Sequence, residues 1–123
     1  MSIAVACIQQ VDDDSFAAMI DYSKNHSDNL LIVDFYADWC SPCKMLTPIF
    51  CKIAEDYCFK TDKIKFYSAD ANESGNSMEN FSIKSIPTLL FLKGGEKVDS
   101  LTGAQAEDVI VKQIESCLNV DKK

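Results

Sequence analysis

Hydrophobic residues in this chain occur in two patterns, short continuous runs and stripes with the spacing of a helix face. Continuous apolar runs bounded by turn residues predict buried strands, because a strand covered on both faces is apolar throughout. The last two strands should form a hairpin, since residues 93–96 contain two glycines that suit a tight turn. The predicted strands are residues 3–8, 30–36, 64–69, 88–92 and 97–101.

Apolar stripes that recur every three to four residues predict the helices between these strands. The first two helices end near Ser23 and Cys58, and the last two end near Phe81 and Leu118. Pro48 falls inside the second helix and should bend it, because the proline ring removes one backbone hydrogen bond. The order of elements is therefore β-α-β-α-β-α-β-β-α.

This order predicts the fold class. The first half requires parallel strands joined by helical crossovers, whereas the end is an antiparallel hairpin followed by a helix. We expect an α/β fold with a central mixed five-stranded sheet flanked by four helices. A length of 123 residues suits one domain that spans residues 1–123.

Composition narrows the range of functions. The net charge of −7 argues against nucleic-acid and anionic-membrane partners, which require basic patches. No apolar run is long enough to span a membrane, and the first residues lack the basic segment and long apolar stretch of a signal peptide. We therefore expect a cytoplasmic protein. Because thiols stay reduced there, we do not interpret the six cysteines as a disulfide framework.

The strongest functional signal is Cys40-Ser41-Pro42-Cys43, at the junction of a predicted strand and a predicted helix. Proline is favoured in the first helical turn, so Cys40 should lie just before the helix. There, unpaired backbone N–H groups and the positive end of the helix dipole stabilise a thiolate and lower the pKa of Cys40. Cys43, one turn further on, is placed to attack a mixed disulfide on Cys40, as in thiol–disulfide exchange.

Two other interpretations of this cysteine pair are weaker. Zinc sites use two close cysteine pairs, or a cysteine pair with a histidine pair. Here Cys51 and Cys58 are too widely spaced for a second pair, and the only histidine, His26, lies in a polar loop. The alternative from a different class is a binding or scaffold subunit of a partner enzyme, whose cysteines are not required.

Asp34 interrupts the apolar strand just before the cysteine pair. Burying a carboxylate there is costly and should raise its pKa. The side chain either reaches water or an ion pair at the rim of the sheet, or it moves protons for the cysteines. We favour proton transfer, because an isolated buried acid so near a reactive pair is typical of a functional site.

Nearly the whole chain resembles the thioredoxin family. The matching residues are 33–44, Pro48, the triplet Ile86-Pro87-Thr88, Gly95 in the hairpin and Gly103 before the last helix. The resemblance implies the thioredoxin fold and a thiol–disulfide oxidoreductase, an electron carrier that reduces protein disulfides and maintains cell redox homeostasis. It also implies a monomer without a bound cofactor or metal. Electrons would come from NADPH through thioredoxin reductase, and clients such as peroxiredoxins or ribonucleotide reductase would receive them.

The resemblance also implies roles for individual residues. Cys40 matches the nucleophile, Cys43 the resolving cysteine of a Cys40–Cys43 redox disulfide, and Asp34 the proton relay. An extended substrate segment would add as a strand beside Ile86, next to a cis peptide bond before Pro87. The implied substrate-binding residues are Trp39, Ser41, Pro42, Ile86, Pro87 and Gly103.

Three positions depart from the family pattern. Ser41 replaces the usual glycine between the cysteines, and Tyr36 replaces a frequent tryptophan. Ser68 stands where some members have a lysine near the buried acid, so the proton relay would depend on water or on Asp34 alone.

The other four cysteines lie outside the motif. Cys51 and Cys58 are expected to be half-exposed thiols, roughly 10 Å apart along one helix and therefore unable to form a bridge with each other. Cys7 and Cys117 lie in apolar patterns and are expected to be small core residues. The sharper hypothesis is that Cys51 or Cys58 forms an intermolecular disulfide or a regulatory adduct under oxidation.

Overall fold

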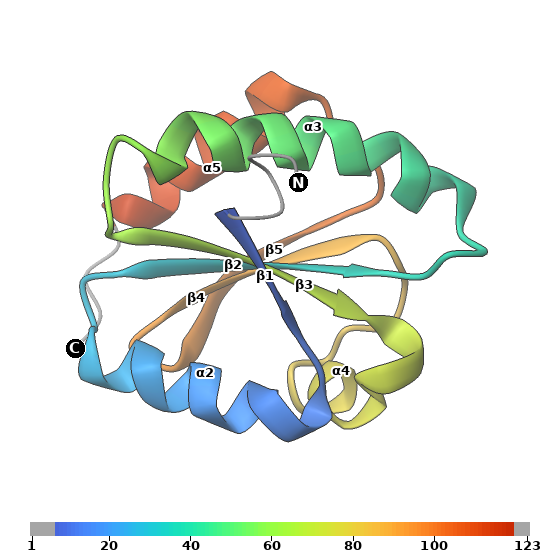
Figure 1. The fold of residues 1–123 in the computed structure, drawn as a ribbon, viewed down its shortest axis with the longest axis horizontal. Coiled ribbons are helices and arrows are strands. Elements are labelled where there is room, and N and C mark those ends of the chain that lie inside the picture. The colour runs from blue at the N-terminus through green and yellow to red at the C-terminus, as the bar shows by residue number, and fades with distance from the viewer. Residues whose placement is uncertain (1–6, 120–123) are drawn as a thin grey trace.

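The computed structural model describes residues 7–119. Its centre is a five-stranded sheet with the strand order β1-β3-β2-β4-β5 (Figure 1). β1 and β2 both run parallel to β3, whereas β4 runs antiparallel to β2 and to β5. The strands are β1 (Ile8–Val11), β2 (Leu30–Tyr36), β3 (Ile64–Asp70), β4 (Thr88–Lys93) and β5 (Glu96–Thr102).

Helices cover both faces of this sheet (Figure 1). The helices are α2 (Asp13–Asn25), α3 (Ser41–Cys58), α4 (Gly75–Asn80) and α5 (Glu107–Leu118), and a short 3₁₀ turn, η1 (Ala71–Glu73), precedes α4. α3 and α5 lie on one face and α2 and α4 on the other. The predicted element order and the mixed sheet are confirmed.

Alternation along β2 explains why both faces are filled. Leu30 and Ile32 pack into the core under α3 and α5, whereas Leu31 and Val33 pack into the core under α2. All four side chains are fully buried. Because side chains of a strand alternate between faces, Asp34 projects to the same side as Ile32, beneath α3.

The first strand lies later in the chain than its hydrophobicity predicted. β1 covers Ile8–Val11, and its register places Ile8 opposite Phe66 of β3. Gln9 and Gln10 are exposed, because β1 is an edge strand with little cover. The prediction of a strand at residues 3–8 from their apolar run therefore agrees with β1 only at Ile8. Residues 3–6 of that prediction lie outside the described residues.

A disulfide that was not expected joins Cys7 to Cys58. Pairing of β1 with β3 brings Cys7 to the last residue of α3, across a sequence separation of 51 residues. The expectation of a half-exposed thiol at Cys58 and a small core thiol at Cys7 was wrong in that the two residues are bonded to each other, because spacing along the chain does not reveal the β1–β3 pairing. Cys117 is buried and free, as expected, and Cys51 is a partly buried free thiol.

Among residues 7–119, no helix combines the length and the hydrophobicity needed to cross a bilayer. Nor does the described part of the chain bring three or more histidine, cysteine or acidic side chains together in a group that could hold a metal ion.

Candidate functional site

The cysteine pair lies at the start of α3. Cys40 is the N-cap residue, in an extended backbone conformation, and Pro42 occupies the first turn. The backbone N–H of Cys43 donates a hydrogen bond to Sγ of Cys40 at 3.2 Å. No acidic side chain occupies the first turn of α3, so the positive helix end is not offset there. This arrangement stabilises a thiolate on Cys40 once the pair is reduced.

Cys40 and Cys43 are joined as a disulfide, with their Cα atoms 5.3 Å apart. Ala37 is buried with them, and Tyr36, Ala71 and Ile86 pack against this small cluster. Cys40 is 6 % exposed and Cys43 is 2 % exposed. An incoming group therefore reaches the sulfur of Cys40 more readily than that of Cys43.

Asp34 lies in β2 with 4 % of its surface exposed. Its Oδ1 atom has no hydrogen-bond partner among the described residues. Burial raises the pKa of Asp34 from its ordinary 3.8 to about 7. At neutral pH the carboxyl group can therefore both accept and donate a proton, which is what a general acid–base group requires.

A cavity of about 140 Å³ connects Asp34 with the surface near α3. Thr47, an exposed residue of α3, lines it together with Cys51 and Ser68. The Thr47 hydroxyl also donates to the carbonyl oxygen of Cys43 at 2.9 Å, which ties the wall of the cavity to the cysteine pair. Motif reasoning missed Thr47, although its position one turn after Cys43 places it on the same helix face.

Ser68 provides no hydrogen bond to Asp34. The two residues are opposite one another in the β2–β3 register, but the Ser68 hydroxyl donates to Oε1 of Gln10 at 2.8 Å. The thiol of Cys51 has a raised pKa, chiefly because of burial and then because of the carboxylates of Glu55 and Asp34. Ile8, Tyr36 and Phe50 complete the lining of the Asp34 cavity, and none of the described residues that line it is a cation.

A second loop completes the surroundings of the disulfide. The peptide bond between Ile86 and Pro87 is cis. Ile86 packs against the Cys40–Cys43 cluster, and the carbonyl oxygen of Pro87 accepts a hydrogen bond from the N–H of Gly103 at 2.8 Å. Gly103 has a φ of 89°, which residues with a Cβ rarely adopt. This hydrogen bond joins the Pro87 loop to the end of β5.

Exposed apolar side chains flank the cysteine pair. Trp39 is 70 % exposed and Met45 is 67 % exposed, and both Ser41 and Pro42 are exposed at the start of α3. Hydrophobic side chains this open to solvent suit a surface that docks another protein. The structure therefore brings together most of the predicted residues, with Asp34 beneath them in the sheet.

Known proteins are similar to this chain in sequence and in fold. The chain matches the family model described as Thioredoxin over residues 7–116. It is 41% identical over 92 residues to thioredoxin M4, chloroplastic, of Arabidopsis thaliana, covering 75% of this chain and 46% of that protein. It is 38% identical over 112 residues to thioredoxin M-type, chloroplastic, of Pisum sativum, covering 91% of this chain and 61% of that protein.

Two further comparisons cover most of both partners. Thioredoxin H4 of Arabidopsis thaliana is 37% identical over 100 residues, which is 81% of each chain. The solved structure of a mutant thioredoxin from Halobacterium salinarum NRC-1 aligns with a TM-score of 0.73 and 28% identity, over 94% of both chains.

The relatives contradict the expected cytoplasmic location. Five of them, 34% to 41% identical, are chloroplastic M-type thioredoxins by name. Net charge and the first few residues did not predict the location. The fold and the cysteine site carry out the same chemistry in any compartment, so these features of the sequence do not distinguish one compartment from another. The chain spans about half to three-fifths of the first two of these relatives.

Proposed function

The chain belongs to the thioredoxin family, and we propose that it is a protein-disulfide reductase that carries two electrons on the Cys40–Cys43 pair. The observation that carries the proposal is the cysteine pair at the start of α3, with the buried carboxyl group of Asp34 beneath it, whose Oδ1 has no partner in the described part of the chain. The start of α3 stabilises the thiolate of Cys40. The carboxyl group of Asp34, with a pKa of about 7, can accept the proton of Cys43.

In the first step, the Cys40 thiolate attacks one sulfur of a client disulfide. A mixed disulfide forms between Cys40 and the client, and the second client sulfur leaves as a thiolate that takes up a proton. The N–H of Cys43, which donates to Sγ of Cys40 in the disulfide form, stabilises the thiolate before the attack. Because Cys40 is the more exposed of the two cysteines, it is the nucleophile.

In the second step, Cys43 attacks Sγ of Cys40 and releases the reduced client. Cys43 is buried, so loss of its proton requires an acceptor inside the protein. Asp34, with its pKa of about 7 and no partner for its Oδ1 among residues 7–119, takes that proton. The cavity beside Asp34 provides the path by which the proton leaves.

The client docks across the exposed end of α3 and the Pro87 loop. Trp39 supplies apolar contact, and Ser41 and Pro42 shape the surface beside Cys40. The backbone of Ile86 binds an extended client segment by strand addition, and Gly103 holds the loop through its hydrogen bond to Pro87.

Electrons reach the pair from NADPH through a thioredoxin reductase, and disulfide-containing proteins such as peroxiredoxins or ribonucleotide reductase receive them. Members of the family carry no prosthetic group, so the cysteines themselves are the redox centre. The protein acts as a monomer in this scheme.

Insulin-disulfide reduction with dithiothreitol as electron source tests the proposal. Wild type should turn over, and Cys40→Ser should abolish turnover. Cys117→Ser is the matched control, because it removes a free thiol of α5 that lies outside both the cysteine pair and the Asp34 cavity. Turnover retained by Cys40→Ser would exclude the dithiol mechanism.

A further inference from the structure

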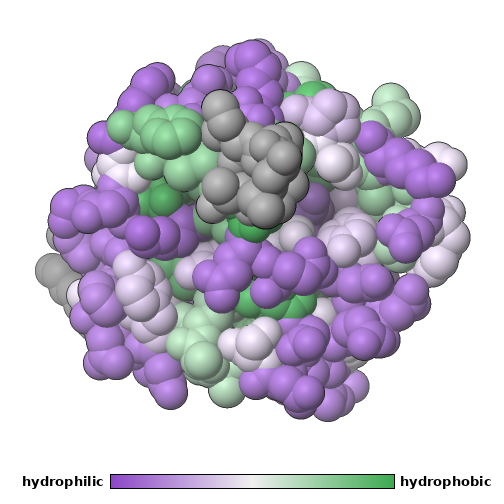
Figure 2. Space-filling model, viewed as in Figure 1, coloured by the Kyte–Doolittle hydropathy of each residue, from purple (hydrophilic) through white to green (hydrophobic). Residues whose placement is uncertain are grey.

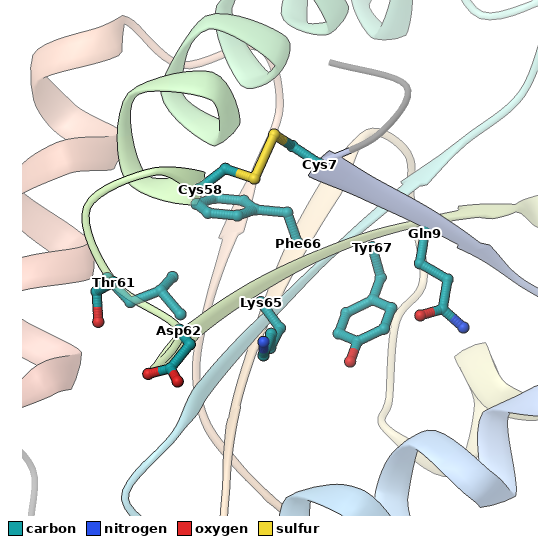
Figure 3. A pocket seen from close by; sticks show the side chains of 9 residues that line it. Cys7, Gln9, Cys58, Thr61, Asp62, Lys65, Phe66 and Tyr67 are labelled. Atoms are coloured by element: carbon teal, nitrogen blue, oxygen red, sulfur yellow. A yellow bond between two sulfur atoms is a disulfide. The ribbon is translucent and has the colours of Figure 1, made fainter. Parts of the chain in front are cut away.

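The Cys7–Cys58 disulfide has no part in the reaction described above. It joins the residue before β1 to the last residue of α3, and both cysteines are half-buried. Both cysteines line a hollow of about 240 Å³. Figure 3 shows the disulfide above the ring of Phe66, on the opposite side of β3 from the side chains of Lys65 and Tyr67. The sulfurs are therefore not sealed in the core.

The two disulfides lie at opposite ends of one helix. Cys40 caps the start of α3 and Cys58 ends it, 18 helical residues later. At about 1.5 Å of rise per residue, these ends are roughly 27 Å apart. Thiol–disulfide exchange requires the attacking sulfur to contact the sulfur that it attacks. The two pairs of one folded molecule therefore cannot exchange electrons directly.

We propose that Cys7–Cys58 is a second thiol–disulfide site, opened by the Cys40–Cys43 dithiol of another copy of this chain. The proposal rests on the proposed function, because that activity supplies the dithiol. Opening follows reduction of Cys40–Cys43 and requires an excess of dithiol, because folding brings Cys7 and Cys58 together across 51 residues and so favours their bridge. The end of α3 at Cys58 carries the negative end of the helix dipole, which disfavours a thiolate there.

The exchange is balanced between the two copies. The donor's Cys40 thiolate attacks Sγ of Cys58, because Cys58 is the poorer leaving group and Cys7 departs as the thiolate. Cys7 then takes up a proton. The donor's Cys43, after losing its proton to solvent, attacks Sγ of Cys40 and releases Cys58 as a thiolate, which takes up a proton from solvent. The donor ends as a Cys40–Cys43 disulfide, and the acceptor ends with two thiols.

The surface at the end of α3 suits such an encounter. Phe59 follows Cys58 directly and is 74 % exposed. Figure 2 shows apolar side chains gathered over this end of α3, on a face that is otherwise mostly hydrophilic. The donor presents its own exposed apolar residues, Trp39 and Met45, around Cys40. Two chains of net charge −7 repel each other, so the exchange should accelerate as salt screens that repulsion.

Two complementary variants test the exchange. The donor is Cys7→Ser/Cys58→Ser, reduced and freed of reductant, and the acceptor is oxidised Cys40→Ser/Cys43→Ser. Alkylation under denaturing conditions and intact mass then count the thiols of each chain. With a tenfold excess of donor, the acceptor should rise from two thiols to four, at least tenfold faster than with a donor that also carries Cys40→Ser.

A trapping experiment tests the direction of attack. A donor that also carries Cys43→Ser should remain joined to the acceptor through Cys58, as shown by peptide mass after digestion. A complex joined through Cys7 would overturn the assigned step. In wild type, which avoids any effect of substitution on folding, complete oxidation should leave two of the six thiols free, and four free thiols would overturn the disulfide itself.

Insulin reduction by the same donor separates the two proposals. A donor that reduces insulin but leaves the acceptor with two thiols would overturn this inference and leave the proposed function intact. A donor that reduces neither substrate would overturn both.

Discussion

The buried carboxyl group of Asp34 should make the stability of the protein depend on pH. Burial raises its pKa from 3.8 to about 7, and the unfolded chain has the ordinary value. The folded state therefore binds more protons than the unfolded state between these two pKa values. Its stability falls as pH rises through this interval, because the unfolded chain ionises first. Replacing Asp34 with asparagine removes this penalty.

The size of the effect follows from the shift. About three pKa units at about 1.36 kcal/mol each give a penalty of about 4 kcal/mol above pH 7. At pH 5 only the part between the unfolded pKa and that pH has accumulated, about 1.5 kcal/mol. The stability difference between Asp34→Asn and wild type should therefore increase by about 2.5 kcal/mol from pH 5 to pH 8.5. Burial of the new amide group also costs free energy, but that cost does not change with pH.

Guanidinium unfolding of both oxidised proteins at a series of pH values measures this difference. Glu79→Gln, which removes one negative charge from an exposed site on α4, corrects for the change in net charge. A difference between Asp34→Asn and wild type that stays constant from pH 5 to pH 8.5 would refute the reasoning. It would mean that Asp34 ionises in the folded protein as easily as in the unfolded chain.

Three further predictions follow from the site and from the second disulfide. Asp34→Asn should slow insulin reduction at pH 7 about 100-fold, the typical contribution of a general acid–base group, with no change in thiol count. Cys7→Ser/Cys58→Ser should lower the free energy of unfolding of the oxidised protein by about 4 kcal/mol, as expected for a bridge across 51 residues, and the difference should vanish in dithiothreitol. Gly103→Ala should cost about 1–2 kcal/mol in urea unfolding, since its φ of 89° is unfavourable for alanine, and should raise KM for insulin by loosening the Pro87 loop.

Hydrophobic pattern predicted the order of elements because buried strands and amphipathic helices leave different periodicities in the sequence. It misplaced β1 because Gln9 and Gln10 are polar and the strand lies at an edge of the sheet. Its position depends on pairing with Phe66 and its neighbours in β3, which no local pattern encodes. Edge strands are the elements for which local hydrophobicity is least informative.

The cysteine pair and Asp34 could be predicted as site residues from the sequence, because they lie in consecutive elements of the chain. Their short separation in sequence indicates that they are close in space. The cavity beside Asp34 could not, because it combines side chains from β1, β2, α3 and β3. The Cys7–Cys58 bridge was missed for the same reason. Its partners are 51 residues apart, and only the β1–β3 pairing brings them together.

The placement of the two disulfides on α3 assigns them different tasks. The helix start stabilises the thiolate of Cys40, and opening Cys40–Cys43 frees a loop of only three residues, so this pair can cycle without loosening the fold. The helix end disfavours a thiolate on Cys58, and opening Cys7–Cys58 removes the covalent tie between α3 and a four-residue edge strand. Because folding favours the long-range bridge and the bridge in turn favours folding, Cys7–Cys58 should open later than Cys40–Cys43 as dithiol accumulates. Cys40–Cys43 therefore transfers electrons, while Cys7–Cys58 makes the stability of the fold depend on the concentration of reduced dithiol.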